Sequence, residues 1–154
     1  LQMSDDLLAL YRDQVLAHSR EPCNFCRLDD ADHVVSGSNP LCGDSLQVYI
    51  ALDGDHVRAL SFEGHGCAIS VASASMMTQM LEGCSCCDAV ETIERVNEML
   101  TSGDGEALDA ELAEQPVAAL AAVRRYPTRI KCATLAWQAV HGALTENADT
   151  VTTE

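Results

Sequence analysis

Three cysteines stand in three short segments whose residues favour a metal-binding or reactive thiol. They are Cys42 in NPLCGD, Cys67 in GHGC and Cys132 in RIKC. Asp44 follows the first by two residues, and Gly43 allows the backbone to turn Asp44 back beside Cys42. Three thiolates and one carboxylate are a complete ligand set for tetrahedral Zn²⁺, and the same thiolates can hold part of an iron–sulfur cluster. The sequence therefore predicts one metal centre on these four residues.

The local setting of each cysteine suggests a different role. Cys67 is expected where a glycine-rich turn meets the N-terminus of a helix, and Cys132 near the start of the last helix, flanked by Arg129 and Lys131. Unpaired backbone N–H groups at a helix N-terminus favour a thiolate and lower the thiol pKa. Cys42 is expected on a turn, whereas the other two anchor helices. The three thiols are thus expected in unequal settings, one on a turn and two at helices.

Five further cysteines form a second group outside this predicted centre: Cys23, Cys26, Cys84, Cys86 and Cys87. The CxxC spacing of the first two is typical of metal or redox sites. The other three lie in CSCC, in an expected loop between helices. Three interpretations are open: a second metal or redox site, which could be a joint four-thiolate zinc site; incidental thiols; or a disulfide.

The composition and net charge of the chain favour some classes of protein and argue against others. The chain has 154 residues, 47% of them hydrophobic, and a formal net charge of −15. We expect one globular domain over 1–154, with Leu1 and Gln2 an artificial extension ahead of Met3. The negative charge argues against a nucleic-acid partner, and no apolar run is long enough to span a membrane. Many cysteines without an export signal indicate a reducing compartment, so we expect a cytoplasmic protein.

The elements that must position the thiols follow from hydrophobic periodicity. The pattern predicts an α+β fold: a small three-stranded antiparallel sheet, then helices, about five to six in all, packed mainly on one side. We expect Asp88 to cap its helix and residues 146–154 to be a frayed tail. An acidic connector is expected over 101–115. The expected strands are 33–36, 45–52 and 56–62, and the expected helices are 4–18, 68–81, 88–100, 116–125 and 130–144.

Three longer segments carry a family resemblance. NPLCGD, GHGCAISVASASMM and RIKCATLAW resemble, in order, the signature segments of the SufU/IscU/NifU N-terminal family of iron–sulfur assembly proteins. The resemblance covers roughly residues 4–146. It implies a SufU/IscU-like fold with Cys42, Asp44, Cys67 and Cys132 in one site at the tip of the sheet.

The residue before the third cysteine points to a branch of that family. IscU scaffolds carry histidine there, whereas the SufU branch has lysine and an insertion before this segment; here the residue is Lys131, and 101–115 fits the insertion. The SufU resemblance implies a zinc-dependent sulfurtransferase. It would accept persulfide sulfur on Cys42 from a SufS-type, pyridoxal-phosphate-dependent cysteine desulfurase and pass it to a downstream scaffold or apo-proteins. Arg129 and Lys131 would dock the partner or tune the thiolates. The alternative is a scaffold that holds a [2Fe–2S] cluster on the same cysteines.

Overall fold

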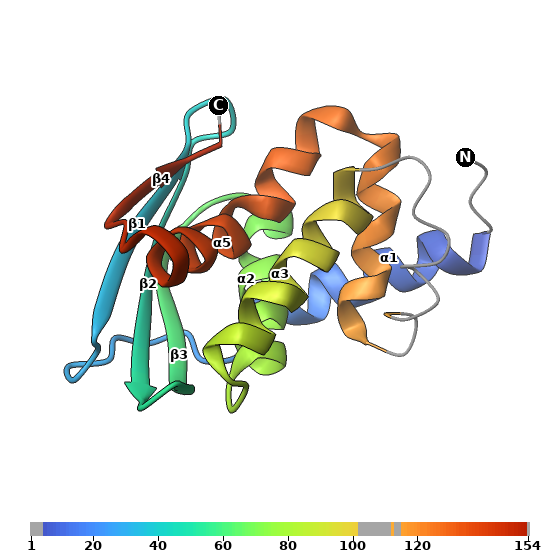
Figure 1. Ribbon diagram of the computed structural model, residues 1–154. Helices are drawn as coiled ribbons and strands as arrows, with labels where there is room; N and C mark the ends of the chain where they lie inside the picture. Colours follow the sequence, from blue (N-terminus) through green and yellow to red (C-terminus); the bar gives the residue numbers. More distant parts are fainter. Residues whose placement is uncertain (1–4, 102–111, 113–114, 154) are drawn as a thin grey trace.

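Four strands in the described part of the chain form one mixed sheet (Figure 1). The computed structural model describes residues 5–101, 112 and 115–153. The sheet order is β3-β2-β1-β4, with β1 (His33–Asn39), β2 (Asp44–Asp53) and β3 (His56–His65) antiparallel and β4 (Thr150–Thr152) parallel to β1. The α+β prediction is confirmed, with one strand more than expected.

Alternating apolar residues build the sheet, as the periodicity predicts. On β2 the side chains of Leu46, Val48 and Ile50 are buried, and Phe62 of β3 is buried beside them. The β1–β2 register pairs Asn39 with Asp44 at the end of the hairpin. The turn between them, light blue at the top of the sheet in Figure 1, carries Cys42. The hairpin therefore delivers two predicted metal ligands to one end of the sheet.

The helices cover one face of the sheet (Figure 1). Helix α5 packs on β1, α2 packs on α5, and α1 packs on α2 and η1. The bounds are α1 (Asp5–Arg20), α2 (Ala68–Leu81), α3 (Cys86–Thr101), the 3₁₀ helix η1 (Pro116–Arg125) and α5 (Pro127–Glu146). None of the described helices is long and apolar enough to cross a membrane.

The core between α2 and α5 contains a buried polar contact. Trp137 is fully buried, and its indole N–H donates to Ser73 Oγ at 2.8 Å. The Ser73 hydroxyl donates in turn to the carbonyl oxygen of Ala133. Met76 and Met77 are buried in the same core. Both methionines and Trp137 therefore serve packing, which keeps α2 and α5 in fixed positions beneath the site.

The expectation of a frayed tail is wrong. Asn147 adopts a left-handed conformation (φ 53°) that ends α5, and the chain then pairs with β1 as β4. The backbone N–H of Thr153 donates to Ser38 at 3.1 Å, which extends the pairing. A polar composition does not prevent edge pairing, because strand hydrogen bonds are made by the backbone.

Two helix starts also differ from expectation. Helix α3 begins at Cys86 rather than 88, and the Ser85 hydroxyl, not Asp88, caps it by accepting from the backbone N–H of Asp88 at 3.0 Å. Helix α5 begins at Pro127, because proline suits the first turn of a helix. Most of the expected connector at 101–115 lies outside the described residues.

Candidate metal centre

The turn between β1 and β2 places Cys42 beside Asp44. The backbone N–H of Cys42 donates to Asn39 O at 3.2 Å, and Gly43 has φ +70°, a conformation that side chains disfavour. Asp44 is buried at the start of β2. Ligand atoms of Cys42, Asp44 and Cys132 all lie within 4.8 Å of one another. These three residues, from segments up to 90 positions apart in the chain, form the centre of the site.

Cys67 joins the site through the Asp44 carboxylate. Its backbone N–H donates to Asp44 Oδ1 at 2.8 Å, and Cys67 is the N-cap residue of α2. Gly66 permits this approach, because a Cβ at that position would lie 2.7 Å from Asp44 Oδ1. The Cys67 thiol also interacts with the Cys132 sulfur. The structure thus groups the ligand atoms of Cys42, Asp44 and Cys132, and it places Cys67 beside them through its backbone, with the Cys67 sulfur outside the 4.8 Å group.

Asn39 is a site residue that the sequence analysis missed. It is fully buried, and its side-chain amide donates to Asp44 Oδ2 at 3.3 Å and to Cys132 Sγ at 3.4 Å. Hydrogen bonds of this kind orient metal ligands. Asparagine is common in turns, so its type alone does not indicate a role at the site; its place at the start of NPLCGD is the available signal.

The environment of Cys132 corrects the expectation of a low thiol pKa. Burial raises the pKa of Cys132, and the nearby Cys42 thiol, Asp44 carboxylate and Cys67 thiol raise it further. Because α5 begins at Pro127, Cys132 lies in its second turn, beyond most of the unpaired N–H groups. A thiolate at this position therefore requires added positive charge, which a metal ion supplies.

Arg129 of α5 interacts with these sulfurs. A side-chain hydrogen bond to Cys132 is the largest cause that raises the pKa of Arg129, and Cys67 and Cys42 contribute as well. Its side chain is otherwise exposed. Lys131 is half-buried, and its carbonyl oxygen accepts from the Thr153 hydroxyl at 3.3 Å. Of the two predicted docking residues, Arg129 is thus exposed and interacts with the site, and Lys131 is half-buried beside Cys132 in the sequence.

The second group of cysteines is divided between two places. The backbone of Cys23 donates to Ser75 Oγ at 2.7 Å on α2, and the neighbouring Asn24 accepts from Phe62 of β3. The carbonyl oxygen of Cys84 instead accepts from the backbone N–H of Val57. Val57 lies five residues before Phe62 on β3, which corresponds to about 16 Å along a strand. The structure does not bring Cys23 and Cys26 together with Cys84, Cys86 and Cys87, so a joint site is not supported.

All eight cysteines lie in the described part of the chain, and all are free thiols. No disulfide joins any two of these cysteines in this structure. Cys26 and Cys87 are exposed, and the Cys84 thiol donates to the carbonyl oxygen of Met80 at 3.4 Å. His65 is exposed at the end of β3.

The fold and the site together define an α+β domain that gathers Cys42, Asp44 and Cys132 at the tip of a sheet, with Cys67 at the adjoining helix N-terminus. Residues 10–133 match the family model described as the NifU-like N-terminal domain. The chain belongs to this family, and the predicted SufU/IscU/NifU membership is confirmed.

Named relatives span nearly the whole chain. The sequence of this chain is 39% identical to that of the zinc-dependent sulfurtransferase SufU of Bacillus subtilis, over 91% of this chain and 92% of that protein. It is 37% identical to the iron–sulfur cluster assembly scaffold protein IscU of Streptococcus pyogenes, over 91% and 86%. A crystal structure of a putative SUF-system scaffold protein from Fervidobacterium islandicum superposes with a TM-score of 0.78 at 30% identity, covering 89% of this chain and 98% of that one.

Proposed function

We propose that this chain is a zinc-dependent sulfurtransferase of iron–sulfur cluster assembly that accepts persulfide sulfur on Cys42. The observation that carries the proposal is the unequal placement of the three thiols. Cys42 lies half-buried on a turn, whereas Cys67 caps α2 and Cys132 is buried within α5. One thiol can therefore leave the centre while the others stay. The similarity to a named SufU supports the same function.

The donor set fits zinc. With Zn–S bonds of about 2.3 Å, tetrahedral geometry places ligand atoms about 3.8 Å apart, and those of Cys42, Asp44 and Cys132 already lie within 4.8 Å. Cys67 would supply the fourth ligand. Bound zinc would keep the thiols deprotonated and protect them from oxidation. The raised pKa of Cys132 supports the need for such a cation.

The transfer step needs no external oxidant or reductant. The Cys42 thiolate attacks the outer sulfur of a cysteine persulfide on the donor enzyme. A new sulfur–sulfur bond forms to Cys42, the bond between the two donor sulfurs breaks, and the donor cysteine leaves as a thiolate. Asn39 holds Asp44 and Cys132 in place during the step, and Arg129 supplies positive charge beside the sulfurs.

The donor in this proposal is a SufS-type, pyridoxal-phosphate-dependent cysteine desulfurase, and the acceptors are downstream scaffold or apo-proteins in the cytoplasm. A second candidate function rests on the similarity to scaffolds named IscU. In that case Cys42, Cys67 and Cys132 would hold a [2Fe–2S] cluster, which thiolate ligands also suit.

One experiment separates the two functions. Turnover of the cognate cysteine desulfurase on L-cysteine is measured alone, with the zinc-loaded chain, and with Cys42→Ala or the exposed control Cys26→Ala. Strong stimulation that only Cys42→Ala abolishes, with one extra sulfur atom on Cys42 by mass spectrometry, supports the sulfurtransferase. Little stimulation, with a coloured cluster on the three cysteines after addition of iron and sulfide, overturns it in favour of the scaffold.

A further inference from the structure

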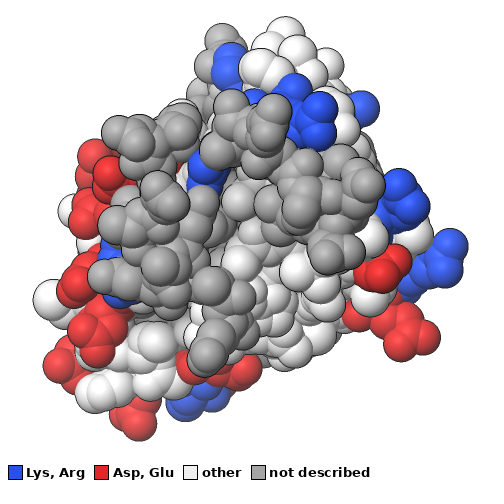
Figure 2. All heavy atoms as spheres, turned by 90° about the vertical axis from the view of Figure 1, so that its right-hand side faces the viewer, with Lys and Arg blue, Asp and Glu red and all other residues white. Residues whose placement is uncertain are grey.

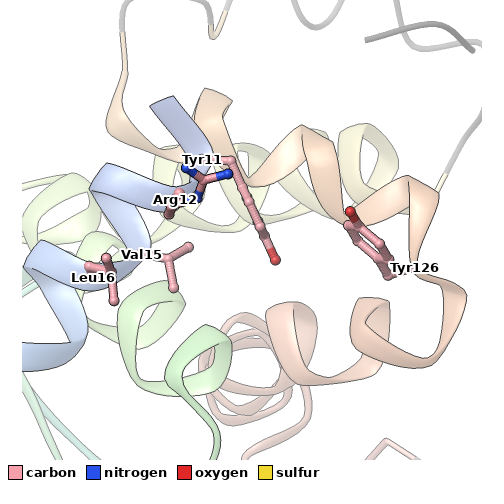
Figure 3. Close-up of a pocket in the computed structure, with 5 residues that line it drawn as sticks. All are labelled: Tyr11, Arg12, Val15, Leu16 and Tyr126. Carbon is pink, nitrogen blue, oxygen red and sulfur yellow. The ribbon is translucent and has the colours of Figure 1, made fainter. Parts of the chain in front are cut away.

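A pocket of about 270 Å³ lies between α1 and the junction of η1 and α5. Figure 3 shows Tyr11 extending from α1 toward Tyr126, with Val15 and Leu16 on the α1 side. The pocket is smaller than the cavities that usually hold small molecules. Its size suits one or two side chains of another protein.

The pocket adjoins the metal centre. Burial is the largest cause that raises the pKa of Tyr11, and Cys67 and Cys132 raise it further, so the phenol lies within electrostatic reach of both sulfurs. Tyr126 precedes α5 directly, and its carbonyl oxygen accepts from the backbone N–H of Arg129 at 2.7 Å. A protein bound in this pocket would therefore be held next to the thiols.

The apolar residues around the site are unusually exposed. The side chain of Leu41, next to Cys42, is 74% exposed, and that of Tyr126 is 46% exposed. Leu16, on the pocket wall, is also exposed. Large apolar side chains left in water close to a reactive centre mark an interaction surface.

The same region is basic in an acidic protein. The stretch RRYPTRIK (124–131) has four cations and no acidic residue, and Arg12 lines the pocket, whereas the chain carries −15 overall. The Nε–H of Arg124 donates to the carbonyl oxygen of Met99 at 2.6 Å. In Figure 2, which views the molecule from the α1 side of Figure 1, most Lys and Arg atoms lie toward the top and right, whereas Asp and Glu line the left and lower edges and also stand at the lower right. The charge complements an acidic partner surface.

We propose that the Tyr11–Tyr126 pocket and its flanking cations, Arg12 and Arg129, anchor the cysteine desulfurase. The occupant is a protrusion of that enzyme with an apolar or aromatic side chain flanked by carboxylates. Tyrosine and arginine are among the residues that most often dominate binding energy at protein interfaces, and opposite charges speed association. The inference rests on the proposed sulfurtransferase function, and it assigns the anchor to residues outside the metal ligands.

The test measures binding of the zinc-loaded chain to the cognate desulfurase, together with stimulation of cysteine turnover. Tyr126→Ala and Arg12→Glu are compared with Val34→Ala, an exposed apolar residue on β1, and Arg27→Glu, an exposed charge reversal elsewhere. We expect at least a tenfold loss of affinity for the first two and less than a twofold change for the controls. Maximal stimulation and zinc content stay at the wild-type level, because the chemistry is intact.

Two outcomes overturn the inference and are distinguishable. If the wild type stimulates the desulfurase and Tyr126→Ala and Arg12→Glu bind like it, the anchor is wrong while the sulfurtransferase stands. If Tyr126→Ala instead abolishes self-association of the chain in sedimentation experiments without changing desulfurase affinity, the occupant is a second copy. Failure of the wild type to stimulate turnover at all overturns the proposed function itself, and the anchor with it.

Discussion

The side-chain amide of Asn39 lies 3.4 Å from the sulfur of Cys132, although 93 positions separate them in the chain. The same amide donates to the Asp44 carboxylate. One buried side chain thus joins the β1–β2 hairpin to helix α5 at the candidate metal centre.

Replacement of Asn39 by Asp tests this relationship. Aspartate has nearly the same shape but replaces the amide donor with an acceptor, so it repels Asp44 and cannot donate to Cys132. We expect zinc affinity to fall about 10- to 100-fold, the range typical of residues that support metal ligands. Competition with a chromophoric chelator measures it. The exposed neighbour Ser38→Ala is the control, and an unchanged affinity for Asn39→Asp would contradict the role.

Gly66 provides a steric test of the contact between Cys67 and Asp44. In Gly66→Ala the new Cβ would lie 2.7 Å from Asp44 Oδ1 and 3.2 Å from its Cγ, so the carboxylate must shift. We expect at least a tenfold loss of zinc affinity, about 1.4 kcal/mol or more.

Gly54→Ala is the matched control for that variant. Gly54 has φ +63°, but its Cβ would have no neighbour within 4 Å. The Gly54→Ala substitution should lower folding stability by about 1 kcal/mol through backbone strain and leave zinc affinity unchanged. Equal zinc affinities for Gly66→Ala and the wild type would show that the Asp44 position is unimportant for the metal.

The raised pKa of Cys132 predicts a pH dependence for the zinc-free protein. An unfolded cysteine titrates near pH 8.5 (roughly), and the folded site favours the neutral thiol. The neutral Cys132 thiol therefore stabilises the folded protein below that pH, and this stabilisation is lost as pH rises toward the higher pKa of the folded state. We expect the free energy of unfolding in urea to fall between about pH 8 and 10.

Cys132→Ala should weaken this dependence, whereas the exposed control Cys26→Ala should keep it. Zinc should remove it, because the bound thiol is already deprotonated. A zinc-free protein whose stability is flat over this range would show that Cys132 is not held in the neutral form.

Ser73 and Ser70 are both buried on α2. We expect replacement by alanine to have different effects on the free energy of unfolding at the two positions. Ser73→Ala removes the acceptor of the Trp137 indole and the donor to Ala133 O, and should cost about 1–3 kcal/mol. Ser70 Oγ is buried without a hydrogen-bond partner among the described residues. Ser70→Ala should therefore be neutral or slightly stabilising. Chemical unfolding of both variants measures the difference, and equal losses would contradict the assignment.

Much of this protein was determined by local sequence. The alternation in 45–52 and 56–62 predicts β2 and β3, and the helical pattern predicts the bounds of α2, because burial on one face selects the period of each element. The three cysteine segments predict the family, and they include the three residues, Cys42, Asp44 and Cys132, whose ligand atoms meet at the tip of the sheet. Glycine at 43 and 66 belongs to this local information, since its missing side chain is read directly from the chain.

Only the tertiary structure decided what depends on distant partners. The parallel pairing of Thr150 with Ser36 is invisible to periodicity, because backbone groups form it between segments far apart in the chain. The same holds for the role of Asn39, whose partner lies on α5, and for the separation of Cys23 from Cys84 along β3. The upward shift of the Cys132 pKa arises from burial among the other ligands, and burial is a property of the folded chain rather than of the residues around one thiol.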